Sequence, residues 1–357
     1  MNPKRTVLVA VHTGRPAGVS VARLVVAMLT RAGLTARVLE SEAADLSVET
    51  AETVPVSSQA ASDTEMVLAI GGDGTLLRAA ELSRPARVPL LGINLGHVGF
   101  LAEADPENLS EAVDQVVDGK YLVEERMTVD VTVRTNGDLT ATTWALNEAS
   151  VEKSQRERML DLVVGVDGRP LSRWGCDGVV FATPTGSTAY AFSAGGPVVW
   201  PEVEALLLVP ISAHALFARP VVVSPRSVLA AEVIGPASGQ GDTSRAVLWC
   251  DGRRMFELDP GARVEVRRGS EPVLLARLQS ARVGTGAGGA GGEGAEIGPP
   301  FTDRLVAKFG LPVAGWRGRG GRRHMPDGGM AERHAPMAVH QGTEAASQRD
   351  EEPGGDA

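Results

Sequence analysis

The first third of the chain alternates short apolar runs with segments whose apolar residues recur every three or four positions. The runs lack polar alternation, which is typical of strands buried on both faces of a parallel sheet. The spaced segments are typical of amphipathic helices. The expected strands are Thr6–His12, Thr35–Leu39, Met66–Ile70 and Val88–Ile93, and the expected helices are Val19–Ala32, Leu76–Leu82 and Glu107–Asp118. This order predicts a parallel, right-handed α/β layer.

After Lys120 the pattern changes to one of short strands separated by turn signals, at Asn136-Gly137, Asp167-Gly168 and Asp177-Gly178. No long helix fits this part of the sequence. The expected strands are Leu122–Arg134, Thr140–Val151, Leu160–Val166, Gly178–Ala182, Pro220–Val223, Val228–Ile234, Arg245–Trp249, Val264–Arg267 and Val273–Arg277. The pattern therefore predicts a second, mostly antiparallel β domain.

We expect an N-terminal α/β domain over residues 1–120 and a β domain over residues 121–282. Residues 283–299 are expected to form a flexible loop, because they contain a low-complexity run of glycine and alanine. The formal G-x-G-x-x-G at Gly284, Gly286 and Gly289 is rejected as a nucleotide-binding motif, because no amphipathic helix follows this motif. Phe301–Phe309 is expected to be a helix, and residues 300–317 to return to the first domain. Residues 318–357 contain few apolar positions, which predicts a disordered tail.

Composition narrows the class of protein. The chain has 357 residues, 43% of them apolar and 22% charged, which is ordinary for a soluble protein with two cores. A net charge of −9 argues against nucleic acid as the main partner, and no apolar run is long enough to cross a membrane. No signal peptide is expected at the N-terminus. Only Cys176 and Cys250 are present, which indicates a reducing, cytoplasmic setting without a zinc cluster.

The stretch Met66–Thr75 carries the first candidate chemistry. A buried strand leads into Gly71, Gly72, Asp73 and Gly74, and a helix begins directly afterwards. Glycine amides at the carboxyl edge of a parallel sheet can bind phosphate, so a carboxylate among them needs a chemical reason. It is either a base that takes a proton from a hydroxyl or an anchor for a metal. The alternative is a simple Asp-Gly turn.

Other loops add polar groups. Asn94–Phe100 is a second glycine-bearing turn at the same sheet edge, in which we interpret His97 as structural. Asn147 and Glu148 could accept the two hydroxyls of a ribose, or simply end a strand. The loop Thr183–Tyr190 is rich in hydroxyls and has no charge, which suits a sugar or a base edge. The segment Pro210–Pro220 could equally pack a subunit interface or contact substrate.

Three stretches together resemble the NAD kinase family, over roughly residues 5–317. They are Gly71–Thr75, Asn147-Glu148, and the Thr183–Tyr190 loop followed by Ser193–Pro197. The resemblance implies an N-terminal Rossmann-like α/β domain, a mostly antiparallel C-terminal β domain, and a site in the cleft between them. It implies phosphorylation of the 2′-hydroxyl of the adenosine ribose of NAD, giving NADP, with a divalent metal and ATP or polyphosphate as donor. It also implies a homo-oligomer, a dimer or tetramer, in which a neighbour's loop completes the site.

The resemblance also implies roles for individual residues. Asp73 matches the proton acceptor, and the amides of Gly71, Gly72 and Gly74 would lie against phosphate. Arg78, one turn along the following helix, would meet a phosphate. The remaining dinucleotide contacts would be Asn147, Glu148, Arg158, Asp177, Thr188, Ala189, Tyr190, Ala191, Phe192 and Ser193. No residue is assigned as a metal ligand. Arg253 departs from the family, many of whose members have glutamine at this position.

Two rival functions remain open at this point. Lipid or diacylglycerol kinases share the Gly-Gly-Asp-Gly-Thr turn, but they need an apolar pocket, for which the polar loop Thr183–Thr188 is a poor substitute. A non-catalytic sensor could bind NAD through the same residues without transferring phosphate. Asp73 favours an enzyme, because a sensor has no use for a base.

Overall fold

The computed structural model describes residues 5–95, 99–104, 106–154, 159–234, 246–279 and 300–312. These residues belong to one compact unit, Met1–Pro312, and a second unit is Val313–Ala357. Several sequence predictions lie outside the described residues: the structural role of His97, the substrate contact of Arg158, the loop 283–299 and the tail 318–357.

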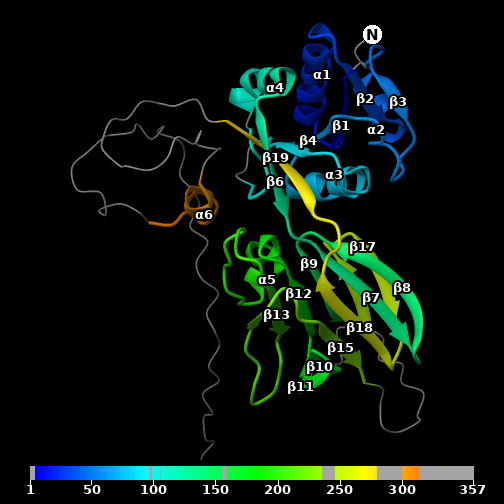
Figure 1. The fold of residues 1–357 in the computed structure, drawn as a ribbon, viewed down its shortest axis with the longest axis vertical. Coiled ribbons are helices and arrows are strands. Elements are labelled where there is room, and N and C mark those ends of the chain that lie inside the picture. The colour runs from blue at the N-terminus through cyan, green and yellow to red at the C-terminus, as the bar shows by residue number, and fades with distance from the viewer. Residues whose placement is uncertain are drawn as a thin grey trace, which may run out of the picture. The chain divides into compact units, whose positions relative to one another are not determined.

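The first sheet has seven strands in the order β3-β2-β1-β4-β5-β19-β6 (Figure 1). All neighbouring pairs are parallel except β19 with β6. The strands are β1 (Thr6–Val11), β2 (Thr35–Leu39), β3 (Glu52–Val54), β4 (Met66–Ile70), β5 (Leu90–Ile93), β6 (Tyr121–Arg126) and β19 (Val273–Leu278). The predicted parallel α/β layer is confirmed.

Helices cover both faces of this sheet. They are α1 (Pro16–Arg31), α2 (Glu40–Leu46), α3 (Asp73–Ala86) and α4 (Leu109–Asp118), the last preceded by the 3₁₀ turn η1 (Pro106–Asn108). In β1, Val7 and Val9 pack in a core with α1 and α4, whereas Leu8 packs in a second core with α3. Because successive side chains of one strand point to opposite faces, both faces need apolar residues. This explains the unbroken apolar runs.

The remaining strands form two antiparallel sheets of six strands each, ordered β11-β10-β15-β18-β7-β8 and β14-β13-β12-β9-β16-β17. Side chains of both sheets share one core that includes Trp174 and Phe181, so the sheets pack as a sandwich. The strands are β7 (Val129–Thr135), β8 (Asp138–Ala145), β9 (Glu148–Lys153), β10 (Leu160–Val166), β11 (Arg169–Cys176), β12 (Gly178–Ala182), β13 (Leu206–Ile211), β14 (Val221–Val223), β15 (Leu229–Val233), β16 (Ala246–Cys250), β17 (Arg254–Leu258) and β18 (Ala262–Arg268). The predicted antiparallel β part is confirmed.

The structure differs from the sequence prediction at the junction of the two parts. Strands β6 and β19, which the sequence analysis grouped with the β domain, are hydrogen-bonded neighbours in the first sheet. The change from the first sheet to the sandwich therefore falls after Arg126. Asp177-Gly178 is not a hairpin turn, because β11 and β12 on either side of it lie in different sheets. Short-range turn signals cannot distinguish a hairpin from a change of sheet.

Three short elements complete the described part of the chain. They are the 3₁₀ turn η2 (Thr185–Thr188), the one-turn helix α5 (Tyr190–Ser193) and α6 (Phe301–Phe309). The expected helix at Phe301–Phe309 is confirmed. Arg304 anchors α6, because its Nη1 donates hydrogen bonds of 3.0 Å to the carbonyl oxygens of both Phe100 and Ala102. Among the described residues, no helix is long and apolar enough to cross a membrane.

A cation–π contact joins α3 to the sandwich. The guanidinium of Arg84 lies 4.4 Å from the ring centroid of Trp144, and that of Arg254 lies 4.5 Å from it. Arg84 belongs to α3, whereas Trp144 and Arg254 belong to β8 and β17. Desolvated contacts of this kind are worth about 1–2 kcal/mol each. The helix that begins with Asp73 is thus tied to the strands of the second part.

The two faces of α1 give a matched test of the core. Leu29 is fully buried and Leu24 is 50% exposed. Leu29→Ala should lower the free energy of unfolding by about 2–5 kcal/mol, because it leaves a cavity between α1 and the sheet. Leu24→Ala should cost less than about 1 kcal/mol. Urea denaturation of both variants measures the difference, and equal losses would contradict the assigned faces of the helix.

Candidate active site

Asp73 is the first residue of α3, directly after the turn that ends β4. Its side chain is 36% exposed, and its Oδ1 is buried without a hydrogen-bond partner among the residues that the structure describes. Gly99, in the second glycine-bearing turn, makes room for it: a Cβ at Gly99 would lie 2.5 Å from this oxygen. The two glycine turns therefore meet at Asp73, as the sheet-edge argument predicts.

Two opposing effects act on the ionisation of Asp73. Burial raises the pKa of this carboxyl group, and this is the largest effect. The ammonium group of Lys308 and the backbone N–H of Leu101 lower the pKa, because both stabilise the ionised form. The distance from Lys308 Nζ to Asp73 Oδ2 is 3.9 Å. Asp73 is thus a partly desolvated carboxylate beside one cation, an environment that suits a base.

A cavity of about 230 Å³ opens in front of Asp73. Its lining comes from both parts of the molecule: Asp73, Phe100, Leu101, Asn147, Thr185, Thr188, Ala189 and Lys308. Four residues that the sequence analysis singled out, Asp73, Asn147, Thr188 and Ala189, are therefore brought together although they are far apart in the sequence. We call this space the Asp73 cavity.

The Asn147-Glu148 turn is held by a residue to which the sequence analysis gave no role. Asp251 Oδ1 accepts hydrogen bonds from the backbone N–H groups of Asn147 at 2.7 Å and Glu148 at 3.4 Å. Its Oδ2 accepts one from the N–H of Leu146 at 3.0 Å, and Arg254 Nη2 donates to the same oxygen at 2.7 Å. Asp251 is only 6% exposed. An Asp-Gly pair directly after the apolar run Ala246–Cys250 was the available signal.

The hydroxyl-rich loop lies against the same turn. Thr183 Oγ1 donates a 2.6 Å hydrogen bond to the carbonyl oxygen of Leu146, and the Thr183 N–H donates to that of Asn147 at 2.9 Å. A Cβ at Gly186 would lie 1.9 Å from the carbonyl oxygen of Asn147, so only glycine fits there. Ser187 Oγ donates to the carbonyl oxygen of Pro184 at 2.7 Å and accepts from the N–H of Val199 at 2.9 Å. Two of the four hydroxyls therefore build the loop, while Thr185 and Thr188 line the Asp73 cavity.

Glu148 lines a different cavity, of about 320 Å³, together with Ser150, Glu152, Tyr190, Trp249 and Gly252. Burial raises the pKa of Glu148 to about 8, with further contributions from the charges of Asp251 and Glu152. The Tyr190 hydroxyl donates to Glu152 at 3.3 Å. Because Asn147 and Glu148 line different cavities, a ligand in contact with both side chains must span the two.

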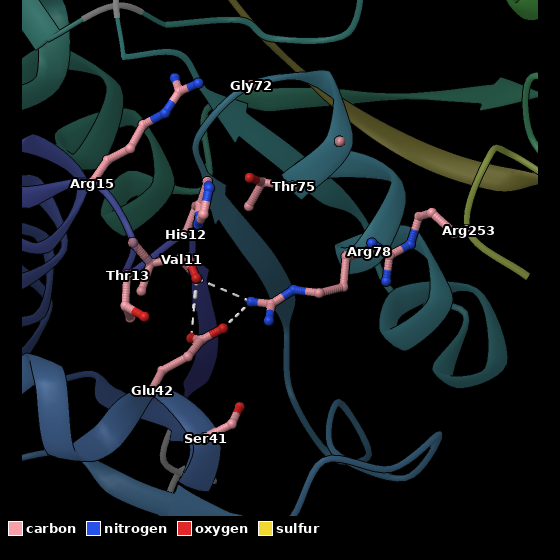
Figure 2. Close-up of a pocket in the computed structure, with 11 residues that line it drawn as sticks. Val11, His12, Thr13, Arg15, Ser41, Glu42, Gly72, Thr75, Arg78 and Arg253 are labelled. Atoms are coloured by element: carbon pink, nitrogen blue, oxygen red, sulfur yellow. Dashed lines mark hydrogen bonds and ion pairs between the residues drawn. The ribbon is translucent and has the colours of Figure 1, made fainter.

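A third cavity, of about 440 Å³, lies beside the N-terminus of α3 (Figure 2). It is lined by Val11, His12, Thr13, Arg15, Ser41, Glu42, Gly72, Gly74, Thr75, Arg78 and Arg253. Three arginines against one carboxylate give it a positive lining. We call this space the arginine cavity. Gly72 and Gly74 line the arginine cavity, whereas Asp73 between them in the sequence lines the Asp73 cavity.

Arg78 is held in place by an ion pair with Glu42 (Figure 2). Glu42 is 2% exposed and also accepts a 3.1 Å hydrogen bond from the N–H of Val11, while Arg78 donates to the carbonyl oxygen of Val11 at 3.1 Å. Arg253 enters the same cavity from the turn between β16 and β17 and pairs with Glu81 on α3 at 3.1 Å. Arg78 and Arg253 are therefore oriented before any ligand binds.

The other predicted site residues lie around these cavities. Asp177 forms an ion pair with Lys153 and lines none of the three cavities. Ala191 is buried in a small core beside β12 and β13. Phe192 is 41% exposed and stacks on Phe309 of α6 with ring centroids 4.4 Å apart. Gly71 and Ser193 are not among the described residues that line the three cavities, so their roles stay predictions.

The raised pKa of Glu148 predicts a pH dependence of stability. Its folded-state pKa of about 8 lies above its ordinary value of 4.5, so the stability that the neutral group contributes is complete below about pH 4.5 and is lost as the pH rises through about 8. Glu148→Gln, which stays neutral, should therefore become more stable than the wild type as pH rises from about 5 to 8. Thermal melting across this range measures it. The exposed Glu111→Gln control should run parallel to the wild type, and a parallel Glu148→Gln curve would contradict the assignment.

Comparisons with known proteins agree with this arrangement. A family model described as ATP-NAD kinase N-terminal domain matches residues 8–121, and one described as ATP-NAD kinase C-terminal domain matches residues 146–278. The NAD kinase of Thermobifida fusca (strain YX) is 57% identical over 328 residues, which cover 89% of this chain and 93% of the relative. NAD kinase 2 of Streptomyces avermitilis is 59% identical over 316 residues, covering 88% and 97%.

Solved structures with the same fold include two kinases. Yeast NADH kinase complexed with NADH aligns with a TM-score of 0.71 at 22% identity, covering 79% of this chain and 85% of that one, which supports the fold alone. An NAD kinase from Archaeoglobus fulgidus in complex with ATP aligns with a TM-score of 0.57 at 26% identity, covering 76% and 92%. Given the two matched family models and relatives that share more than half of its aligned residues, the chain belongs to the NAD kinase family.

Proposed function

We propose that Asp73 accepts the proton when this NAD kinase transfers the γ-phosphoryl group of ATP to the 2′-hydroxyl of the adenosine ribose of NAD. One observation carries the proposal: Asp73 lines a cavity of amide, hydroxyl and backbone groups, and its neighbours Gly72 and Gly74 line a second cavity that carries three arginines. In a phosphoryl transfer the attacking hydroxyl and the leaving group lie roughly in line on opposite sides of the phosphorus, so the acceptor and the donor need neighbouring sites beside the base. The reaction converts NAD to NADP with ATP.

The arginine cavity suits the triphosphate of ATP. Arg15, Arg78 and Arg253 supply positive charge, and Gly72, Gly74 and Thr75 bring the N-terminal end of α3 with its backbone N–H groups to the same space. These N–H groups have no side-chain cap, since the residue before the helix is Gly72. The triphosphate would therefore be bound by fixed dipoles and by arginines, in place of the lysine loop of other ATP-binding folds.

The Asp73 cavity suits the acceptor ribose. Asn147, Thr185 and Thr188 offer amide and hydroxyl groups, and the nicotinamide-distal part of NAD would extend past Ala189 toward Tyr190 and Glu148. A neutral Glu148, favoured by its raised pKa of about 8, could donate a hydrogen bond as well as accept one. The adjoining residues Ala191, Phe192 and Ser193 would support this wall.

The proposed phosphoryl transfer needs no reactant other than ATP and NAD. The oxygen of the ribose hydroxyl forms a bond to the γ-phosphorus, its proton moves to the Asp73 carboxylate, and the bond between the γ-phosphorus and the bridging oxygen breaks. ADP leaves with that electron pair. Positioning of the two substrates supplies most of the acceleration, since the protein forms no covalent intermediate.

A divalent metal is expected to accompany ATP rather than to reside in the protein. Among the described residues, no group of three or more His, Cys, Asp or Glu side chains is arranged to hold a metal ion. Mg²⁺ is commonly bound through substrate phosphates, where it offsets their charge. Such an ion would supply charge compensation at the phosphates, and no step of the mechanism is routed through it.

Three further expectations remain part of the proposal. Polyphosphate could replace ATP as donor, because the arginine cavity recognises phosphate charge and has no obvious base-specific wall. A homo-oligomer would bring a neighbour's loop to the open side of the NAD site. The cytoplasmic setting is supported by Cys176 and Cys250, which are both buried and unpaired.

Asp73→Asn tests the base. The amide keeps the size of the side chain but cannot take the proton, so kcat should fall by about 10²–10⁴-fold while the Kd for NAD stays within about threefold. NADP formation from NAD and ATP measures the rate, and calorimetry measures binding. The exposed Asp114→Asn on α4 is the control. Wild-type turnover in Asp73→Asn would refute the assignment. The same assay with diacylglycerol in place of NAD tests the rival acceptor. With polyphosphate in place of ATP it tests the alternative donor.

Arg15→Gln tests the position of the donor. Arg15 is exposed at the rim of the arginine cavity, so its loss should not affect folding. Removing a charge-assisted contact to phosphate should raise the KM for ATP by about tenfold or more and leave the KM for NAD unchanged. Arg169→Gln, an exposed arginine on β11, serves as the control. A larger effect on NAD than on ATP would place the donor elsewhere.

A further inference from the structure

Helix α6 brings a lysine to the Asp73 cavity from a part of the chain to which the sequence analysis gave no chemical role. Lys308 lines this cavity, and its Nζ lies 3.9 Å from Asp73 Oδ2. Asp73 and Lys308 are the charged residues among those that line it. The chain has only four lysines, Lys4, Lys120, Lys153 and Lys308. Of those described, Lys120 pairs with Asp118 and Lys153 with Asp177, outside the cavities.

The position of Lys308 is fixed by the packing of its helix. Arg304 and Leu305 are buried, 4% and 8% exposed, and Lys308 follows them by four and three residues, so all three lie on the same face of α6. Arg304 binds the backbone of Phe100 and Ala102, in the segment that also lines the cavity. Next to Lys308, Phe309 stacks on Phe192 of α5 and contacts the ring of Phe100. The ammonium group is therefore presented to the cavity by contacts on both sides of it.

The distance between the two groups leaves both available to a substrate. At 3.9 Å the pair is longer than a hydrogen-bonded ion pair, and Asp73 Oδ1 has no hydrogen-bond partner in the described part of the chain. Lys308 remains 38% exposed. A carboxylate alone would repel an incoming phosphoryl group. An ammonium group beside it offsets that repulsion and can donate to the phosphoryl oxygens, which carry negative charge throughout the transfer.

We propose that Lys308 is a further catalytic residue, whose ammonium group contacts the phosphoryl group as it moves from ATP to the ribose and then contacts the same group as the 2′-phosphate of NADP. The inference rests on the proposed function, because it takes the hydroxyl beside Asp73 as the acceptor. Lys308 keeps its proton throughout, while the proton of the hydroxyl goes to Asp73. The lysine stabilises the transferred group and takes no part in the proton transfer.

The test uses the full chain with Lys308→Met, Lys308→Arg and the control Lys120→Met. Methionine keeps an unbranched side chain without the charge, and Lys120 is a surface lysine 63% exposed. Two quantities are measured for each protein: kcat for NADP formation, and the separate Kd values of NAD and NADP by calorimetry without ATP. Thermal melting checks that each variant is folded.

Lys308→Met should lower kcat by about 10²-fold and raise the ratio of the Kd of NADP to the Kd of NAD by about tenfold or more, since only NADP carries the transferred phosphate. Lys308→Arg should recover part of both effects, and Lys120→Met should change neither. If Lys308 only fastens α6, its loss would weaken NAD and NADP equally, and an unchanged ratio would overturn the proposal. Turnover of Asp73→Asn is read separately, so a failure of the proposed base is not confused with a failure of Lys308.

Discussion

The burial of β4 on both faces governs where chemistry can occur in this protein. Every residue of Met66–Ile70 is buried, between the core that contains α1 and α4 and the core that contains α3. A strand enclosed in this way cannot carry a functional polar side chain along its length, because a buried charge without a partner is too costly. The first position at which one can emerge is the turn after Ile70. Asp73 occupies the end of that turn and benefits from the positive end of α3.

Surrounding groups act differently on three carboxyl groups near the site. Burial raises the pKa of Asp73 and of Asp251, but Lys308 opposes this rise at Asp73, and three backbone N–H groups and Arg254 oppose it at Asp251. Burial raises the pKa of Glu148 to about 8, and the nearby acids Asp251 and Glu152 raise it further. The proposed function uses this difference, with a neutral Glu148 for recognition of the acceptor and an ionised Asp73 for proton transfer.

The sequence alone predicted the strands and helices with a clear hydrophobic pattern, and it predicted the glycine turns. The apolar runs of β1, β2, β4 and β5 identified the parallel layer, and Gly71–Gly74 identified the sheet edge that carries Asp73. It was not sufficient for pairings over long distances in the chain. Nothing local in Val273–Leu278 indicates that it lies beside β5, because a short, mostly apolar strand fits either sheet. The hydrogen bond from the N–H of Leu146 to Asp251, 105 residues away, could likewise not be predicted from the sequence.

The same limit applied to side-chain roles. The hydroxyls of Thr183 and Ser187 were expected to face a ligand, but they bond to the backbone of their own surroundings, since a loop pressed against Asn147 must satisfy its buried carbonyl groups. Glu42 and Lys308 carry no local signal of their importance. The role of Glu42 becomes visible only when the fold brings it to Arg78. The role of Lys308 becomes visible only when the fold brings it to Asp73.

The place of β19 between β5 and β6 has a consequence for how the molecule is made. The neighbours of this strand leave the ribosome early, but β19 itself is synthesised only after every strand of the sandwich. During translation β5 and β6 therefore lack their shared neighbour until β19 has been made. Slow completion of a sheet is typical of folds with many contacts between residues far apart in the sequence. Because α6 comes later still, Asp73 gains its cationic neighbour Lys308 only after β19 has been synthesised. The lining of the Asp73 cavity is therefore complete only after all the strands of the first sheet and of the sandwich have been made.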